Sequence, residues 1–394
     1  MSLPSERAAL GFGRAVFSPE HEAFRSSVRR FFAEQVEPNV AAWERQGMFP
    51  RELFVEAAKL GMLCAGISTD YGGVGGDFLH HVILHEEHGY SVAGAALEAG
   101  LCTDSCAYGL LFAGTEDQKR EWLPRLASGE VIAEIAMSEA HSGSDVRAIR
   151  TTARRSAGDY VLDGHKMWVS NAPICDLIMV AARLEDGPDP ANAPVELLLV
   201  EARQTGVAVS PPTELMVRGA GGVSQIFFDN VRVPEARILG GRNGRGMARL
   251  LQALTNARLT VCARMMAACE LAVQLTLEFT RDRVVFGQRV LDYQNTRFKL
   301  AELSTQIRVG RVFLDSLLER SLAGALDATE VAMAKLWISE LEARVMDECV
   351  QLFGGFGFSN EYPISKMYAF ARLHRLYLGT SEIMKVMISR GFDL

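Results

Sequence analysis

The sequence predicts a mostly helical protein with a β domain in its middle. Two helix-periodic sections enclose a central stretch of short runs rich in Val, Ile, Leu and Phe, separated by Gly, Asp and Pro. The length of 394 residues suffices for two or three packed units. We therefore expect an N-terminal all-α domain over residues 1–130, a middle antiparallel β-barrel over 131–240 and a C-terminal four-helix bundle over 241–394.

The N-terminal section repeats apolar residues at helical spacing. SPEHEAFRSSVRRFFAEQV (18–36) opens with a Ser-Pro-Glu helix-entry signal, and PRELFVEAAKLGML (50–63) continues the pattern. TEDQKREWLPRLASGE (115–130) is typical of a short capped helix that ends in a turn.

The middle section changes to strand-like runs. Examples are GDYVLDGHKMWVS (158–170), DLIMVAARLE (176–185) and SQIFFDNVRV (224–233). The dipeptide Asp163-Gly164 predicts a hairpin turn inside the first of them. An antiparallel sheet or small barrel follows.

Helical period returns in the C-terminal section. Residues 245–283 read as one long helix that is apolar on much of its surface, as a core helix is. Two more helices are expected over 293–321 and 327–353, and a bundle is their natural packing.

Composition excludes several classes of function. The net charge is −7 without a polybasic stretch, so we expect no nucleic-acid partner. We also expect no secretory signal and no membrane span, because no uncharged apolar run approaches the roughly 18 residues that a span needs. The seven cysteines form no zinc-type spacing, so we expect no metal, buried thiols and a cytoplasmic location.

Four stretches could carry chemistry, although each alone is more often a loop, a core tryptophan or a helix corner. AMSEAHSGSD (136–145) has small residues that let a phosphate approach the backbone. GHKMWVSNA (164–172) places Trp168 and Ser170 on one strand face, where they could hold a flat ring. RDRVVFGQRVLDYQ (281–294) and QLFGGFGFSNEYP (351–363) are Gly-containing corners, and the latter is no dinucleotide fingerprint because it follows a helix.

A fifth stretch, LHRLYLGTSEIMK (373–385), contains a turn that could bind an oxygen. Gly379, Thr380 and Ser381 interrupt an apolar run, and Glu382 opens a new helix behind a hydroxyl cap. Backbone N–H groups at such a turn can hold an anion or a carbonyl oxygen. Leu378, just before the glycine, can neither give nor take a proton.

In this order, the motifs resemble the acyl-CoA dehydrogenase family of flavoproteins along nearly the whole chain. Further matches are Glu37-Pro38, Trp43-Glu44, Tyr71-Gly72-Gly73, VRVP at 231–234 and GTSEI at 379–383. The resemblance implies FAD as cofactor, an acyl-CoA substrate in fatty acid metabolism and an electron-transferring flavoprotein as acceptor. It also implies a homo-oligomer, usually a tetramer built as a dimer of dimers.

The resemblance also implies which residues hold FAD. Met137 and Ser138 would border the flavin pyrimidine, Trp168 would pack on the isoalloxazine, and the Ser170 hydroxyl would bond N5. Gly143 and Ser144 would lie near the phosphate-bearing arms. The remaining cofactor positions would reach the adenosine half or the FAD of a neighbouring subunit: Arg283, Phe286, Gln294, Gln351, Gly355, Thr380 and Glu382.

The catalytic base is missing from both positions where this family carries it. In the family, a backbone N–H matching Leu378 polarises the thioester oxygen, and a Glu at that position, or just before an arginine matching Arg258, removes the α-proton. This chain has Leu378 and Ala257 there. The family's usual Glu-Pro-Gly also reads Glu139-Ala140-His141, and its Arg-Asp pair ahead of the turn reads Ala369-Phe370.

Three hypotheses remain open. The first is α,β-dehydrogenation with a relocated base, for which Asp104 is a candidate ahead of Glu98 and His141. The second is altered chemistry, such as desulfination or enoyl reduction, which needs no strong base. The third is a non-catalytic FAD-binding subunit of a hetero-oligomer whose partner carries the base.

Overall fold

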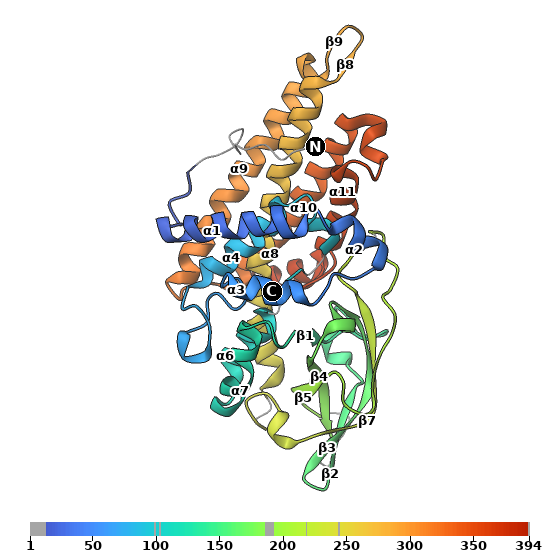
Figure 1. The fold of residues 1–394 in the computed structure, drawn as a ribbon. Coiled ribbons are helices and arrows are strands. Elements are labelled where there is room, and N and C mark those ends of the chain that lie inside the picture. The colour runs from blue at the N-terminus through green and yellow to red at the C-terminus, as the bar shows by residue number, and fades with distance from the viewer. Residues whose placement is uncertain are drawn as a thin grey trace. The chain divides into compact units, whose positions relative to one another are not determined.

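The computed structural model describes residues 13–97, 100–101, 104–185, 193–217, 219–242 and 245–392. The chain is mostly helical, with a curled β-sheet in its middle section, which confirms the predicted fold class (Figure 1). The chain forms two compact units, and the predicted domain boundaries remain a prediction. The first unit combines residues up to Glu37, Val82–Ala95 and the chain from Arg258, and the second contains Pro38–His81 and Ala96–Ala257.

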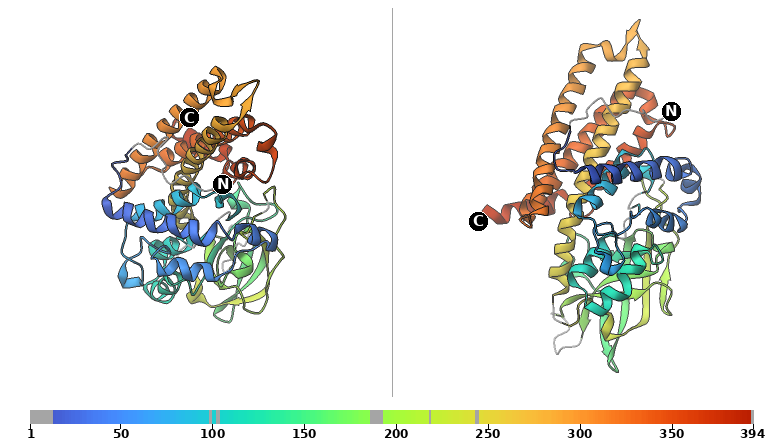
Figure 2. Two further views of the ribbon diagram at one scale, coloured as in Figure 1. Left: turned by 45° about the horizontal axis from the view of Figure 1, so that its top comes forward. Right: turned by 60° about the vertical axis from the view of Figure 1, so that its left-hand side comes forward.

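The first unit is helical. Its helices are α1 (Pro19–Phe31), most of α4 (Phe78–Tyr90), α8 (Gly246–Asp282) from Arg258 onward, α9 (Gln294–Leu322), α10 (Ala328–Phe353), α11 (Pro363–His374) and α12 (Ser381–Ser389). Helices α8 to α11 run side by side (Figure 2). A small hairpin of β8 (Val284–Val285) and β9 (Gln288–Arg289) connects α8 to α9.

Helix α8 is the core helix of this unit. Its residues from Leu259 to Val273 are buried around most of the helix, which is why the sequence there is apolar on every side. The segment Ala253–Asp282 is long and apolar enough to cross a membrane by those two criteria alone. However, 83% of its most apolar window is buried inside the fold, as in a core helix.

The second unit is built on a seven-stranded sheet. Its strands are β1 (Ala133–Ala136), β2 (Thr152–Ser156), β3 (Asp159–Val169), β4 (Leu177–Glu185), β5 (Val195–Glu201), β6 (Val207–Val209) and β7 (Ser224–Val233). The order is β1-β4-β2-β3-β7-β6, with β5 on the other edge of β4. The pairs are antiparallel except for β1–β4 and β2–β4, which are parallel.

Strand β4 lies at the centre of this unit. Six consecutive residues of its apolar run are buried, because both of its faces are covered. One face packs with α6 (Asp104–Ala113) and α7 (Glu116–Ala127), and the other lies inside the curled sheet. The remaining described α-helices are shorter: α2 (Val40–Gln46), α3 (Glu52–Lys59) and α5 (Gly94–Leu97).

The hairpin predicted at Asp163-Gly164 is wrong. The β2–β3 turn lies at Ala157 and Gly158, whose φ values of 51° and 93° suit a two-residue hairpin. Asp163 and Gly164 instead lie inside β3 at an irregularity of the β3–β7 pairing. Gly164 is needed there because a Cβ would lie 2.4 Å from Oγ1 of Thr151.

Candidate functional site

The turn between α11 and α12 has an unusual backbone conformation. Leu378 has φ 53° and Gly379 has φ 96°, and a Cβ on Gly379 would lie 2.6 Å from Cε of Met384. The positive φ at 379 favours glycine, while Leu378 adopts a left-handed conformation that is uncommon for its type. Thr380 caps α12 by accepting a hydrogen bond from the Ile383 amide at 3.3 Å.

Two buried cations hold this turn. Nε of Arg258 donates to the Leu378 carbonyl at 2.8 Å, and Nζ of Lys335 donates to the Gly379 carbonyl at 2.7 Å. Because a trans peptide places C=O and N–H on opposite sides, these bonds turn the N–H groups of Gly379 and Thr380 away from the cations. Burial lowers the pKa of Arg258, and it lowers that of Lys335 to about 8. The turn therefore lies in a positive environment, where its amides could bind an oxygen.

The structure describes no carboxylate inside this turn. Leu378 is half-buried, and Ala257 precedes Arg258 on α8. The exposed carboxylate of Glu340, on α10, accepts hydrogen bonds from Ser381 at 2.8 Å and from Arg375 at 3.2 Å. Glu340 was not identified from the sequence, because it lies on another helix.

The structure leaves the proposed substitutes for the base untested. Asp104 begins α6, but its side chain lies outside the described residues, as does Glu98. Nε2 of His141 lies 3.2 Å from Oε2 of Glu139, so His141 faces the loop after β1.

In the second unit, the ends of β1 and β3 bring the predicted flavin residues together. The Met167 amide donates to the Ser138 carbonyl at 2.9 Å, next to Met137 and Trp168. Trp168 is 54% exposed, with φ 62°, at a second irregularity of the β3–β7 pairing. Strand β3 ends at Val169, so strand alternation does not place Ser170 on the face of Trp168 as predicted; Ser170 lies in the following turn.

Glu139 anchors the loop that carries Gly143 and Ser144. Its buried carboxylate accepts hydrogen bonds from the Thr151 hydroxyl at 2.6 Å and from Nζ of Lys166 at 2.7 Å. Burial opposes its ionisation, but the donated hydrogen bonds outweigh burial and lower the pKa of Glu139 to about 2. Burial also lowers the pKa of Lys166 to about 8, which still leaves the pair ionised at neutral pH. Gly143 and Ser144 stay exposed, and a Cβ at 143 would meet no atom within 4 Å.

The predicted cofactor residues of the helical unit lie on its surface. Phe286 is 101% exposed at the tip of the β8–β9 hairpin, and the Arg283 guanidinium lies 5.4 Å from the centre of the Phe356 ring. Hydrogen bonds from its own backbone amide and from Thr380 lower the pKa of the exposed Glu382. The remaining members are also exposed: Gln294, Gln351 and Gly355.

Two buried polar clusters were not found from the sequence. In the second unit, Nδ2 of Asn171 donates to Oε1 of Glu134 at 2.8 Å and to the Gly100 carbonyl at 3.2 Å. Burial raises the pKa of Glu134 to about 8, against the opposing bond from Asn171. The glutamate lies within an apolar run, so only its alternation on β1 could have drawn attention to it.

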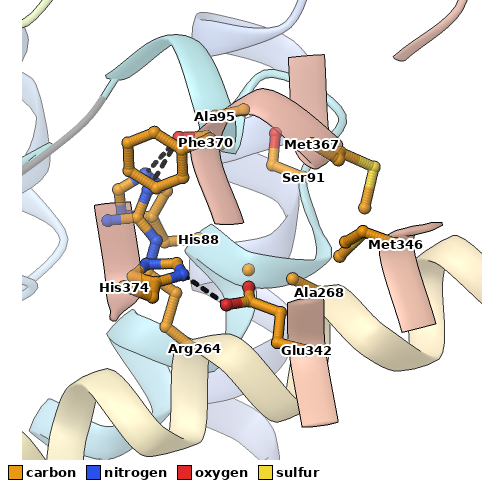
Figure 3. A pocket seen from close by; sticks show the side chains of 12 residues that line it. His88, Ser91, Ala95, Arg264, Ala268, Glu342, Met346, Met367, Phe370 and His374 are labelled. Atoms are coloured by element: carbon orange, nitrogen blue, oxygen red, sulfur yellow. Dashed lines mark hydrogen bonds and ion pairs between the residues drawn. The ribbon is translucent and has the colours of Figure 1, made fainter. Parts of the chain in front are cut away.

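The second cluster lines a small cavity of about 20 Å³ within the helical unit (Figure 3). Nδ1 of His374 lies 2.6 Å from Oε2 of Glu342, and Arg264 donates to the Gly94 carbonyl at 2.8 Å. His88 also donates to that carbonyl, and burial together with Arg264 lowers the pKa of His88 well below its usual range.

Sequence models of three domains match this chain. They describe the acyl-CoA dehydrogenase N-terminal domain over residues 18–130, the middle domain over 134–231 and the C-terminal domain over 244–392. The chain is 38% identical over 395 residues to the mitochondrial long-chain specific acyl-CoA dehydrogenase of Rattus norvegicus, covering 99% of this chain and 90% of the relative.

Solved structures agree with these matches. An acyl-CoA dehydrogenase from Geobacillus kaustophilus superposes with a TM-score of 0.92 at 35% identity, covering 97% of this chain and 100% of that one. A glutaryl-CoA dehydrogenase from Mycobacterium smegmatis in complex with FADH2 superposes with a TM-score of 0.87 at 26% identity, covering 96% and 95%.

Proposed function

The chain belongs to the acyl-CoA dehydrogenase family, and from this premise we propose that it is an FAD-dependent oxidoreductase that acts on an acyl-CoA thioester. The observation that carries the proposal is the turn at 378–380, whose carbonyl groups are held by Arg258 and Lys335. These bonds fix the two peptide groups that follow the Leu378 amide, so this amide could meet a thioester oxygen with little reorganisation, which is how enolate charge is stabilised.

The residues present fit FAD. Trp168 exposes its indole beside the partly exposed Ser138 and Ser170, and the loop at Gly143 leaves its backbone open to a phosphate. A solved relative of this fold carries FADH2. When bound, FAD would accept the hydride that leaves the β-carbon of the acyl chain.

The protein's own groups would bind and orient the substrate. The Leu378 amide would donate to the thioester oxygen, and the two cations behind the turn would favour negative charge on that oxygen. The Ser170 hydroxyl would donate to flavin N5, and Trp168 would support the ring. Removal of the α-proton still needs a base, and Asp104 remains the proposed candidate.

The absence of a carboxylate at Leu378 and Ala257 favours a second candidate function. A substrate that loses a leaving group, or an enoyl-CoA that is reduced, needs no strong base beside the α-carbon. A subunit that binds FAD and acyl-CoA while a homologous partner supplies the base would have the same two positions empty.

We also propose that the chain forms a homo-oligomer, as a dimer of dimers, and passes electrons to an electron-transferring flavoprotein. The exposed residues Arg283, Phe286 and Gln351 support the first part, because an FAD shared between subunits needs them at the surface. Light scattering after size-exclusion chromatography would measure the mass. The six described thiols are free and buried, which supports a reducing, cytoplasmic location.

An anaerobic titration of the FAD-loaded protein with a panel of acyl-CoAs tests the activity. Bleaching of the flavin absorbance would establish α,β-dehydrogenation, and Asp104→Asn should then be made to test the base. A shifted spectrum without bleaching would favour altered chemistry or the non-catalytic subunit. A purified protein that cannot be loaded with FAD would contradict the proposal.

A further inference from the structure

Four buried ionisable side chains line the cavity beside His374. His88, Arg264, Glu342 and His374 are each at most 4% exposed, and they come from α8, α10, α11 and the α4 region of one compact unit. Met346 and Phe370 are among the apolar residues that line the rest of the cavity (Figure 3). Burying such groups is costly unless each has a hydrogen-bond partner, so their concentration here indicates a site for a polar group.

One atom of this cluster has no partner among the described protein groups. Nδ1 of His374 pairs with Glu342 at 2.6 Å, while Nε2 is buried and makes no hydrogen bond. A carboxylate accepts hydrogen bonds only, so Nδ1 of His374 carries a proton, and Nε2 is left without a partner as either a lone pair or a second N–H group. A hydroxyl group suits either form of the ring, because it can both donate and accept a hydrogen bond.

The size and charge of the cavity further restrict which chemical groups can bind in it. A volume of about 20 Å³ holds one oxygen-sized group, such as a water or a hydroxyl. A second carboxylate would need more room and would be repelled by Glu342. A methyl group would leave Nε2 unpaired.

The cavity and the turn that is proposed to hold the thioester oxygen are both lined by α8 and α10, which gives their spacing along these two helices. Arg258, at the turn, and Arg264, at the cavity, are six residues apart on α8, which is about 9 Å along the helix axis. Lys335 and Glu342 are seven residues apart on α10, which is about 10 Å. This distance is of the order of a medium-length acyl chain.

We propose that the cavity beside His374 binds a hydroxyl group carried near the far end of the acyl chain, and that this hydroxyl forms a hydrogen bond with Nε2 of His374. The proposal rests on the proposed function, since it assumes that a thioester is held at the Leu378 turn. It assigns hydroxyacyl-CoA thioesters as the substrate class.

Binding measurements on the FAD-loaded protein test the proposal without requiring turnover. Isothermal titration calorimetry would compare unsubstituted and ω-hydroxy acyl-CoAs in matched pairs from hexanoyl to decanoyl, with the ω-carboxy analogues as a third series. For at least one chain length, we expect the hydroxy thioester to bind at least about tenfold more tightly than its unsubstituted partner. Equal binding within every pair, or tighter binding of the carboxy series, would overturn the proposal.

Variants test whether the tighter binding of hydroxy thioesters depends on this cavity. In His374→Gln the amide can still donate to Glu342 but Nε2 is lost, and we expect the tenfold preference to fall to about one. Ala268→Val fills the cavity from α8, keeps every polar partner and should have the same effect, which keeps the test valid if His374→Gln does not fold. His165→Gln on β3, outside this unit, should retain the preference.

The binding results distinguish a failure of the proposed hydroxyl site from a failure of the proposed function. Acyl-CoAs that bind without discrimination would overturn the hydroxyl site alone. If no thioester in the panel binds or perturbs the flavin, the proposed function and the hydroxyl site both fail.

Discussion

The Leu378 position separates two roles that the family usually combines in one residue. Its backbone amide can hold an oxygen whatever the side chain is, but the isobutyl group cannot accept a proton. The left-handed φ of 53° suits leucine and glutamate equally poorly, so a Leu378→Glu substitution adds no backbone strain.

We expect Leu378→Glu to gain dehydrogenase activity. A carboxylate placed beside a polarised thioester should raise the rate of flavin bleaching by at least about a hundredfold on some acyl-CoA, which is the usual contribution of a positioned base. Anaerobic stopped-flow absorbance measures it. Leu376→Glu, at a 48% exposed position two residues earlier, is the matched control and should stay inactive. A variant that binds FAD yet gains nothing on a broad panel would contradict our assignment of the turn.

Glu134 should make stability depend on pH. Burial raises its pKa in the folded protein to about 8, above the ordinary value of 4.5, so its contribution is fully present below pH 4.5 and is lost as the pH rises through 8. We expect Glu134→Gln to change unfolding free energy little at pH 5 and to stabilise the protein above pH 8, by up to about 5 kcal/mol.

Urea unfolding at pH 5, 7 and 9 would check the Glu134 prediction. Glu130→Gln, four residues earlier and exposed, provides the control and should show no such trend. A Glu134→Gln effect that is the same at every pH would mean that the folded protein ionises this carboxyl normally.

At the scale of elements, local patterns predict the long helices well. Helices α8, α9 and α10 begin and end within a residue or so of the predicted ranges, because their apolar period runs over many turns. The prediction of a hairpin turn at Asp163-Gly164 was wrong for a physical reason. A dipeptide that suits a turn also suits an irregularity inside a strand, and the pairing with strand β7 determines which of the two forms.

Hydrogen bonds between residues that are far apart in the sequence explain why several residues of the site were not predicted. Arg258 and Leu378 are 120 residues apart, Asn171 and Glu134 are 37 apart, and each bond depends on packing that local sequence does not encode. The turn itself was predicted because its glycine, hydroxyl cap and first-turn acid are neighbours in the chain. Charge partners such as Lys335 became visible only once α10 was packed beside the turn.

Helix α12 offers a test of the cap that the sequence predicts. Thr380 accepts a hydrogen bond from the Ile383 amide, and α12 has only nine residues, so Thr380→Ala should destabilise the protein by about 1 kcal/mol. Thr305→Ala is the matched control, since its hydroxyl bonds the Ala301 carbonyl inside α9, where alanine is the better helix former. Equal losses in both variants, measured by urea unfolding of the FAD-free protein, would argue against a capping role.

At the scale of the whole molecule, an ion network joins residues from position 14 to position 315 of the sequence. Glu86 on α4 is fully buried and accepts from Arg14 at 2.5 Å, from Arg25 at 2.7 Å and from Arg311 at 2.7 Å. Burial opposes ionisation of Glu86, but the three guanidinium groups outweigh burial and lower its pKa to about 2. The network connects α1, α4 and α9 within one compact unit.

Removing the Glu86 charge should expose how much this unit depends on the network. Glu86→Gln leaves the buried Arg25 and Arg311 and the half-buried Arg14 without their shared counter-ion, so we expect a loss of about 3–5 kcal/mol at pH 7. Because the folded pKa lies below the ordinary value of 4.5, the charge stabilises the wild-type protein above that pH and ceases to do so as the pH falls toward 2. The difference in unfolding free energy between the wild-type protein and Glu86→Gln should therefore narrow in acid.

Glu22→Gln is the control: it removes an exposed carboxylate from the same Arg25 and should cost less than about 1 kcal/mol. Unfolding curves at pH 7 and pH 3 decide the matter: equally small losses for both variants would mean that the arginines find other partners and that the unit is held by its apolar core alone.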